Sequence, residues 1–588
     1  MKTQTLKAGA FLKKLSSLLI FLLTFAIMLT GCKKSADESS GEVPSSAETI
    51  FSTDTVNFLN ADGEANYNII RSDSANSTVV QLATDIFRGL RAAHDVNFKN
   101  ITDAEVDDGS YEILIGDTNR PESKAAKEYI INNLGGRYND YIIATMGNKI
   151  VIYGITDDSL ALAVQYFIDQ YASKATIEEG ILYTVKTEGD FVDITINGVN
   201  VVKYSFVKPR FNTSYLTQLE TEKMVSSLCT KTGYKISVLN DTEAEETDYE
   251  IIIGNCERSG VEKISDYDTY KITVTDKKVY INGGSPYATA MGVSEFGKMV
   301  ESNSLKTVEA SYNETLANYD KATTYHPTWV EDFDGDNLDL TKWVLMDTIE
   351  AGKNGKQSVR STDPNDVFVK DGCFNIWCRQ DDENYYGGQI RTTGIMTYKY
   401  GYLEESAIIP HGRGFWSALW ASKKGPDAVA DGQLLRAEID VNECFGDANV
   451  VASNMHRWTT SLGEAAGYKK TSLDGGYSGQ KKYYHPDAGS NFSDTFHTYG
   501  FLWTPEIAAF TCDGEIYFSY KINEKEEDLL AFHHDLYLIL SVACGLKSDG
   551  WSVTTDPEQW ANTNKLIVDY VHIYQLQDGV HELNNLLK

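Results

Sequence analysis

The sequence predicts a multidomain protein with tandem α/β (α+β) repeat domains in its N-terminal half and an all-β sandwich in its C-terminal part. Three observations support this prediction. The segment Tyr-Glu-Ile-Leu-Ile-Gly at 111–116 recurs as Tyr-Glu-Ile-Ile-Ile-Gly at 249–254. After residue 327 the apolar pattern changes to short, aromatic, alternating segments. Asp-Gly pairs separate many of these segments, as they do in β-hairpins.

The bulk properties allow several domains and argue against one class of partner. The chain has 588 residues and a net charge of −31, from 84 acidic and 53 basic side chains. It is long enough for several sizeable cores. No basic excess is available to release counterions from a polyanion, so we expect no nucleic acid partner. The acidity suits a solvent-exposed surface, and we expect a monomer.

Residues 1–32 have the pattern of a targeting segment. A lysine-rich start precedes an apolar run, Leu18–Leu29, which is short for a membrane-spanning helix. Leu29-Thr30-Gly31-Cys32 then resembles a bacterial lipoprotein signal, in which cleavage leaves Cys32 to be acylated. The resemblance implies a lipid-anchored membrane lipoprotein on the extracellular face of the cell envelope. An ordinary signal peptide and an uncleaved helix are the alternatives.

Residues 33–48 lack periodicity and are expected to form a flexible tether. The cysteines after Cys32 are odd in number, and none has metal-ligand spacing with nearby histidines. We therefore expect mostly buried thiols rather than a disulfide framework. These cysteines are Cys229, Cys256, Cys373, Cys378, Cys444, Cys512 and Cys544.

The repeat predicts two α/β subdomains, 49–186 and 187–318. Beyond the shared motif, residues 140–154 match residues 269–283, and a helical pattern follows each. Each unit is predicted as β-α-β-β-α-β-β-α, with the middle helix of the second copy reduced to residues 260–265. The units resemble non-catalytic α/β domains beside catalytic domains of bacterial glycosidases. Spacing, polysaccharide binding and plain scaffolding all remain open as their role.

The most informative stretch is Glu438-Ile-Asp-Val-Asn-Glu443, which follows a predicted linker at 319–327 and several short strands. Ile439 and Val441 favour a strand, on which Glu438 and Asp440 share a face. One β-bulge would return Glu443 to that face. Like charges so close together require one carboxyl to hold its proton while its partner stays ionised.

An aromatic strand precedes these acids. Trp416 and Trp420 are four residues apart in Phe-Trp-Ser-Ala-Leu-Trp, hence on one face of a strand. Paired carboxylates beside aromatic platforms are what glycoside hydrolysis requires, because the apolar faces of sugar rings pack on Trp and Tyr. Core packing is the alternative for one of these tryptophans.

Several segments in order resemble glycoside hydrolase family 16. They are Glu-Asp-Phe-Asp-Gly at 331–335, Tyr-Gly-Tyr-Leu-Glu at 400–404, the bulged acidic motif at 438–443, Phe-His-Thr-Tyr at 496–499 and Val-Asp-Tyr-Val-His-Ile-Tyr at 568–574. The resemblance implies a concanavalin A-like β-jelly-roll over 328–577, with a tail at 578–588. It implies Glu438 as nucleophile, Glu443 as general acid/base and Asp440 as their electrostatic partner. Departures from the family pattern are Leu434–Ala437 before the motif and Glu405 after Glu404.

The resemblance extends to further residues. His456 matches a histidine in the substrate cleft, with a core histidine as the alternative. Trp551 and Arg391 are further cleft candidates, with surface exposure as the alternative for Arg391. No cofactor is expected for catalysis. Many family members carry a structural calcium, for which the matching positions are Asp332, Gly372 and Asp569, and oxygen ligands suit that ion.

The predicted function is a retaining endo-glycosidase acting on a β-linked polysaccharide. The bulged motif resembles that of β-1,3-glucanases (laminarinases) and galactan-cleaving members, so β-1,3- or mixed β-1,3-1,4-glucan is the favoured substrate. A galactan-cleaving enzyme of the agarase or carrageenase type and a non-catalytic carbohydrate-binding lipoprotein are the alternatives. The same two glutamates would also serve transglycosylation.

Overall fold

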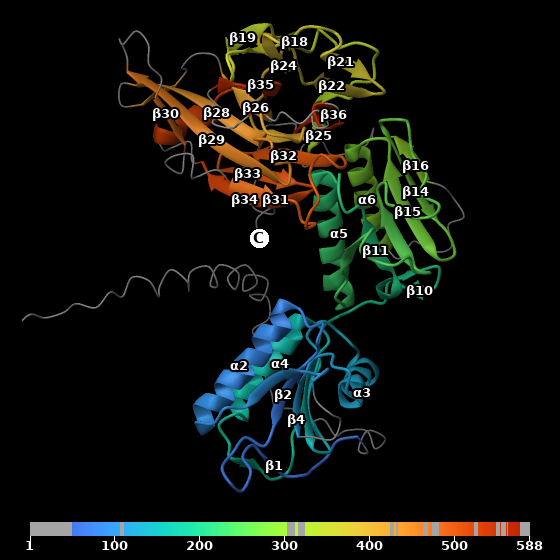
Figure 1. Cartoon of the computed structure of the whole chain (residues 1–588). Coiled ribbons are helices and arrows are strands. Elements are labelled where there is room, and N and C mark those ends of the chain that lie inside the picture. Colours follow the sequence, from blue (N-terminus) through green and yellow to red (C-terminus); the bar gives the residue numbers. More distant parts are fainter. Residues whose placement is uncertain are drawn as a thin grey trace, which may run out of the picture. The chain divides into compact units, whose positions relative to one another are not determined.

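The chain divides into two compact units, one built on the residues up to Gly189 and one on Asp190–His581 (Figure 1). The computed structural model describes residues 50–105, 111–302, 312–315, 324–423, 428–430, 433–461, 469–472, 481–522, 527–547, 553, 560 and 562–576. The expected signal with Cys32, the tether and the tail at 578–588 lie outside the described residues. No helix within the described ranges is long and apolar enough to cross a membrane.

The first unit is a mixed sheet with helices, in the strand order β3-β2-β4-β6-β5-β8. Its helix α2 begins where the Asn76 side chain accepts a hydrogen bond from the Val79 amide, and Ala83, Ile86 and Leu90 form its buried stripe. The elements are β1 (Val56–Asn57), β2 (Asn68–Arg71), α2 (Ser77–His94), β3 (Lys99–Thr102), β4 (Glu112–Ile115), α3 (Pro121–Tyr129), a π-helical turn (Ile130–Leu134), β5 (Tyr141–Met146), β6 (Lys149–Gly154), α4 (Asp157–Gln170), β7 (Thr176–Ile177) and β8 (Leu182–Val185).

A second α/β sheet opens the second unit, in the matching order β12-β11-β13-β15-β14-β16. The prediction of a short helix at 260–265 is wrong, because no helix lies between β13 and β14. Gly260 there has a φ of +82°, and a Cβ atom would lie 2.7 Å from the Tyr280 hydroxyl. The elements are β9 (Thr195–Ile196), β10 (Val199–Asn200), β11 (Ser205–Lys208), α5 (Tyr215–Thr232), β12 (Val238–Asn240), β13 (Glu250–Ile253), β14 (Thr269–Val274), β15 (Lys278–Gly283), α6 (Pro286–Glu301) and β16 (Tyr312–Thr315).

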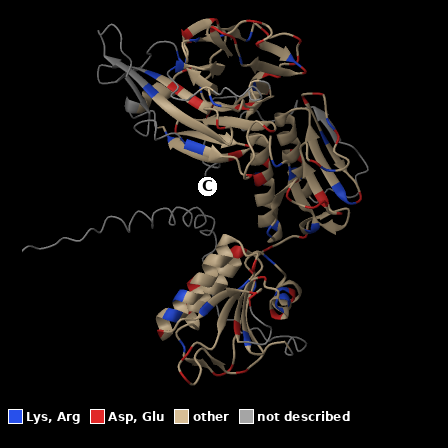
Figure 2. Ribbon diagram, in the orientation of Figure 1, with Lys and Arg blue, Asp and Glu red and all other residues tan. Residues whose placement is uncertain are grey.

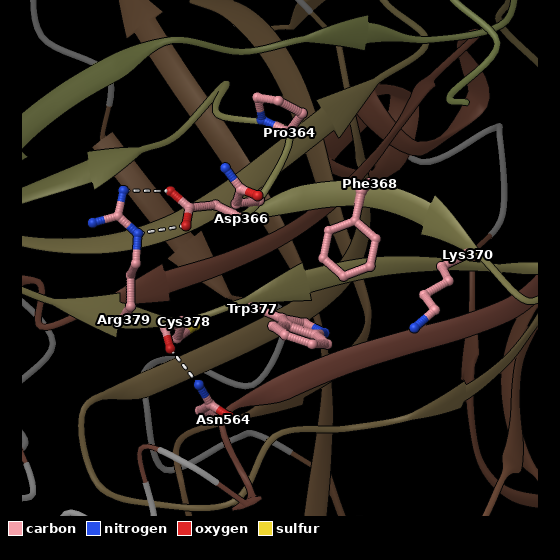
Figure 3. A pocket seen from close by; sticks show the side chains of 9 residues that line it. Pro364, Asp366, Phe368, Lys370, Trp377, Cys378, Arg379 and Asn564 are labelled. Carbon is pink, nitrogen blue, oxygen red and sulfur yellow. Dashed lines mark hydrogen bonds and ion pairs between the residues drawn. The ribbon is translucent and has the colours of Figure 1, made fainter. Parts of the chain in front are cut away.

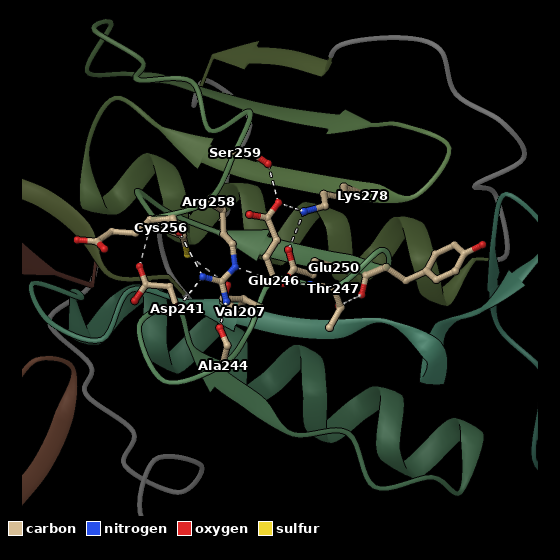
Figure 4. A network of polar contacts seen from close by, with 12 residues as sticks. Val207, Asp241, Ala244, Glu246, Thr247, Glu250, Cys256, Arg258, Ser259 and Lys278 are labelled. Carbon is tan, nitrogen blue, oxygen red and sulfur yellow. Dashed lines mark hydrogen bonds and ion pairs between the residues drawn. The ribbon is translucent and has the colours of Figure 1, made fainter.

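A buried ionic network occupies the same place in both sheets. In the second sheet, the first residue of β13, Glu250, contacts Arg258 at 3.3 Å and Lys278 at 3.0 Å (Figure 4). In the first sheet, Glu112 begins β4 and contacts Arg120 at 3.0 Å and Lys149 at 3.4 Å. A buried charge is stable only when it is paired, so these pairs tie the loops after each core strand to the strand itself.

The rest of the second unit is a sandwich of two sheets. One sheet has the order β21-β22-β36-β25-β32-β33-β34, with β17 beside β36. Its strands are β17 (His326–Glu331), β21 (Val367–Lys370), β22 (Cys373–Trp377), β25 (Gly401–Ile408), β32 (His497–Trp503), β33 (Ile507–Cys512), β34 (Glu515–Lys521) and β36 (Lys565–Gln575). Strand β17 starts two residues before the expected boundary at 328.

The other sheet has the order β19-β20-β24-β35-β26-β28-β29-β30. Leu403 and Phe501 of the first sheet and Leu419 and Ile439 of this one belong to one buried core. The strands are β18 (Val344–Leu345), β19 (Thr348–Ala351), β20 (Gln357–Arg360), β23 (Arg379–Gln380), β24 (Asn384–Arg391), β26 (Phe415–Ser422), β27 (Ala428–Ala430), β28 (Gln433–Cys444), β29 (Val450–Ser461), β30 (Lys469–Ser472), β31 (Lys481–Tyr484) and β35 (Tyr537–Cys544).

Two of the predicted Asp-Gly signals close hairpins of the first sheet. Asp371-Gly372 joins β21 to β22, and Asp513-Gly514 joins β33 to β34. All four residues have a positive φ, between 47° and 84°, which is the conformation of a type I′ turn. Asp334-Gly335 lies in a loop after β17, and the pairs at 431–432 and 474–475 lie outside the described residues.

The second α/β sheet and the sandwich share a buried polar contact at the start of α5. The carboxylate of Glu404, on β25, accepts hydrogen bonds from the Ser214 hydroxyl and the Tyr215 amide, each at 3.0 Å. It also accepts from the hydroxyls of Tyr402 at 2.7 Å and Tyr570 at 2.8 Å. A carboxylate at a helix N-terminus is stabilised by the unpaired amides and the helix dipole.

Replacing this carboxylate should therefore destabilise the second unit. In Glu404→Ala, buried donors from both parts lose their acceptor, and the free energy of unfolding should fall by about 3 kcal/mol or more. Urea denaturation of the full chain measures the change. Asp382→Ala, which removes an exposed acid of the same sandwich, is the control and should shift stability by less than about 0.5 kcal/mol. Equal stability of the two variants would contradict this role of Glu404.

Candidate active site

Strand β28 contains the predicted β-bulge. Against β26, Leu419 pairs with Asn442 and the next residue, Trp420, pairs with Asp440, so Val441 is the extra residue. Against β29, the register shifts between Asp440 and Glu443 as well. One added residue reverses the alternation of side chains. Glu438, Asp440 and Glu443 therefore share one face of the sheet, which we call the acid face.

The neighbouring strands place aromatic and imidazole groups on the acid face. Residues directly opposite in antiparallel strands share a face, and Trp420 lies opposite Asp440, while His456 of β29 lies opposite Glu438. Trp416, four residues before Trp420, lies on the same face. The strand register therefore places all three side chains on the same face as the acids, as predicted.

Two polar contacts connect the acids to these neighbours. His456 Nε2 lies 3.1 Å from Asp440 Oδ2, and the indole Nε1 of Trp416 donates to Glu443 Oε1 at 3.1 Å. All three acids are more than nine-tenths buried. Burial in a low dielectric strengthens each of these contacts, which hold two of the three carboxylates in fixed orientations.

One side-chain oxygen or nitrogen atom from each of Glu438, Asp440 and His456 lies within 4.8 Å of the other two. Two carboxylates and an imidazole are donors that a divalent metal accepts, and they are also the groups of acid–base chemistry. The three atoms alone do not discriminate between the two uses. The neighbouring pair of Trp416 and Glu443 favours acid–base chemistry, because an indole N–H donates to a carboxylate and does not bind a cation.

The remaining predicted substrate residues divide into one on the acid face and one outside the described residues. Arg391 of β24 lies opposite Ile539 of β35, which lies opposite Trp420, so Arg391 is on the acid face. Trp551 lies outside the described residues. Sequence reasoning missed Ser541 of β35, whose hydroxyl accepts from the Trp420 indole at 3.1 Å. A serine in an apolar strand gives no signal until the register is known.

The three expected calcium positions are Asp332, Gly372 and Asp569. His572 Nε2 lies 2.7 Å from Asp332 Oδ1. Burial and the Asp332 carboxylate together raise the pKa of Asp569, while Lys263 lowers it. Burial and Asp569 raise the pKa of Cys373, the residue after Gly372, to about 11. Asp332 and Asp569 are thus close enough for one charge to affect the other, and carboxylate oxygens are donors that calcium prefers.

A separate pocket of about 460 Å³ lies on the first sheet of the sandwich. Arg379 binds Asp366 through two nitrogens, at 2.5 and 2.9 Å, and Trp377 packs edge-on against Phe368 (Figure 3). None of the three acids lines this pocket. Lys and Arg do not gather into a stripe on either unit in the view of Figure 2, which agrees with the acidic composition.

Comparison with known proteins supplies the class of this domain. Residues 325–576 match the family model described as "Beta-porphyranase A-D, GH16 domain". Glucan endo-1,3-beta-glucosidase A1 of Niallia circulans is 26% identical over 279 residues, which are 42% of this chain and 38% of that protein. Beta-glucanase of Rhodothermus marinus is 28% identical over 275 residues, covering 44% and 87%.

A third relative acts on a different kind of glycan. Keratan-sulfate endo-1,4-beta-galactosidase of Sphingobacterium multivorum is 25% identical over 263 residues, which are 43% of this chain and 56% of that protein. The chain thus spans 38% of the length of the Niallia enzyme and about half of the Sphingobacterium enzyme. Residues 325–576 form a glycoside hydrolase family 16 domain, and the β-sandwich is its jelly-roll.

Proposed function

We propose that the chain is a retaining endo-glycosidase of β-linked polysaccharides. The observation that carries the proposal is the β-bulge, which sets Glu438, Asp440 and Glu443 on one face beside Trp416 and Trp420. Retaining enzymes use two carboxyl groups that flank the scissile bond about 5 Å apart, one as nucleophile and one as acid/base. The tryptophans supply flat apolar surfaces for sugar rings.

Each acid has a step in this proposal. The Glu438 carboxylate attacks the anomeric carbon while Glu443 gives its proton to the leaving oxygen, which breaks the glycosidic C–O bond. Glu443 then takes a proton from water, the water oxygen attacks the same carbon, and Glu438 is released. Asp440 and His456 contact each other and lie within 4.8 Å of Glu438, where they support its charge, and the Trp416 indole orients Glu443. A sugar hydroxyl in place of water gives transglycosylation with the same groups.

The substrate we favour is β-1,3-glucan or mixed β-1,3-1,4-glucan. One relative is named as a glucan endo-1,3-beta-glucosidase and another as a beta-glucanase. A galactan is the second candidate, because the family model is that of a β-porphyranase and another relative is named as a keratan-sulfate galactosidase. The β-linked backbone and the endo mode of attack are common to both candidates.

Removing either glutamate should separate binding from hydrolysis. Glu438→Gln should abolish turnover because no nucleophile remains, and Glu443→Gln should lower it about 100- to 10,000-fold. Both should still bind polysaccharide. Reducing-end assays on laminarin, lichenan, agarose, carrageenan, porphyran and keratan sulfate measure activity and substrate class together.

The matched control is Asp447→Asn, an exposed acid four residues beyond Glu443, which should keep the activity of the parent chain. Nuclear magnetic resonance of the first product should show retained anomeric configuration. Undiminished turnover by Glu438→Gln, or an inverted product, would end the retaining assignment. Cleavage confined to the galactans would replace the glucan with the second candidate.

We further propose that the two α/β sheets are tandem copies of one accessory module. Matching strand order and the matching Glu-Arg-Lys network support this.

The N-terminal Leu-Thr-Gly-Cys segment supports a lipid anchor at Cys32, which would hold the enzyme on the outer face of the envelope where polysaccharide is met.

We propose that Asp332, Asp569 and the carbonyl of Gly372 bind a structural calcium. The ion would neutralise two carboxylates that otherwise repel each other and would join the ends of the sandwich.

Calcium at about 100 times its Kd should raise the free energy of unfolding by about 2.7 kcal/mol. Thermal unfolding with and without calcium measures the gain. Asp569→Asn should remove it, and Asp371→Asn, an exposed neighbour, should not. An equal gain in both variants would contradict the site.

A further inference from the structure

Two adjacent glutamates of β25 point in opposite directions. Glu404 faces the start of α5, as described above, whereas Glu405 points into the interior between the two sheets of the sandwich. Glu405 is 1% exposed, and its Oε1 atom has no hydrogen-bond partner among the described residues. A carboxyl group in an apolar core is costly, so its contacts there indicate a use.

The contact that Glu405 makes is with the catalytic bulge. The amide Nδ2 of Asn442 donates to Glu405 Oε2 at 2.7 Å. Asn442 lies between the inserted Val441 and Glu443, is 3% exposed, and faces the core because it pairs with Leu419. Its other side-chain atom, Oδ1, accepts from the Leu419 amide at 3.2 Å. The Asn442 side chain therefore links the two sheets at the bulge.

This link constrains the backbone next to Glu443. A bulge disrupts the ladder of backbone hydrogen bonds and bends the strand, which leaves the following residue less well fixed than in a regular strand. Here the Asn442 side chain accepts from the backbone of β26 and donates to the opposite sheet. Both ends of the amide are thus engaged on the core side, one residue before the carboxyl that faces the substrate.

We propose that Glu405 is a positioning residue for Glu443 and acts through Asn442. It lies behind the acid face and touches no substrate. The proposal rests on the proposed role of Glu443 as acid/base. A carboxyl misplaced by about 1 Å loses up to about 100-fold in proton transfer, so the tie acts on the step in which Glu443 gives its proton to the leaving group.

The charge state of Glu405 gives the tie a pH dependence. Burial raises the pKa of Glu405 to about 7, and the hydrogen bond from Asn442 opposes this. Tyr499 of the neighbouring strand β32 lies directly opposite Glu405, and burial raises the pKa of Tyr499 well above 10. Burial also raises the pKa values of the nearby Cys444 and Cys512 thiols. These neighbours stay neutral, so Glu405 is neutral in slightly acid solution and becomes an unpaired buried anion above pH 7.

Deprotonation of Glu405 should destabilise the folded state as the pH rises. The folded pKa of Glu405 lies above its ordinary value of 4.5, so the folded state holds its proton more tightly than the unfolded state does. The associated stability is present below pH 4.5 and is lost as pH rises to about 7. Glu405→Gln mimics the neutral carboxyl and should not show this loss. The melting temperature of the parent chain should therefore fall relative to that of Glu405→Gln between pH 4.5 and 7.

The decisive experiment compares leaving groups. An oligosaccharide needs a proton from Glu443 to leave, whereas a dinitrophenolate leaves without one. In Glu405→Ala and Asn442→Ala, kcat/KM for the oligosaccharide should fall about tenfold or more, while kcat/KM for the dinitrophenyl glycoside should stay within about twofold. Glu405→Gln should restore both, which separates positioning from the filling of space. Melting temperatures of all variants show that each is folded at the assay temperature.

Equal losses on both substrates, or no loss on the oligosaccharide, would overturn the positioning role. Glu443→Gln is run in parallel to distinguish the two levels of the hypothesis. If it shows the leaving-group dependence and the Glu405 variants do not, the positioning proposal alone is wrong. If Glu443→Gln shows no such dependence, the acid/base assignment is wrong and the positioning proposal falls with it.

Discussion

The extra residue Val441 in β28 is the constraint on which the site depends. A regular strand alternates its side chains, so without an insertion Glu443 would face the apolar core and leave Glu438 and Asp440 without a third acid. With the insertion, Val441 and Asn442 both face the core and Glu443 returns to the acid face. The apolar core of the sandwich must then accept a polar side chain at the bulge, which it does through the hydrogen bonds of Asn442.

Strand β25 connects this requirement to the rest of the second unit. Glu404, which points away from the core of the sandwich, accepts a hydrogen bond from the first amide of α5. Glu405, which points into the core, accepts one from the side-chain amide of Asn442. Buried carboxyls are tolerated only where donors surround them or where they keep a proton. Glu404 belongs to the first case, with four donors, and Glu405 to the second. Strand β25 thus contacts the α/β part through one face and the catalytic strand β28 through the other.

The sequence was sufficient for the parts of the site that local pattern determines. The bulge followed from three acids that do not fit a two-residue period, and the shared face of Trp416 and Trp420 followed from their spacing. Asp371-Gly372 and Asp513-Gly514 were recognisable as turns because few residues tolerate a positive φ. What could not be predicted depends on contacts between distant segments. The Glu405–Asn442 contact joins two sheets across 37 positions, and Ser541 meets Trp420 only through the strand register. Gly260 was expected inside a helix, and neither its positive φ nor its close approach to Tyr280 has a local signal in the sequence.

Covalent trapping tests most directly whether Glu438 and Glu443 act as a pair across one sugar. A 2-deoxy-2-fluoro glycoside slows both steps and accumulates the glycosyl-enzyme, whose site peptide mapping by mass spectrometry identifies. We expect the sugar on Glu438, and we expect its release by added acceptor to be slowed in Glu443→Gln. Attachment to Glu443, or turnover without any adduct and with inversion of the anomeric carbon, would contradict the pairing.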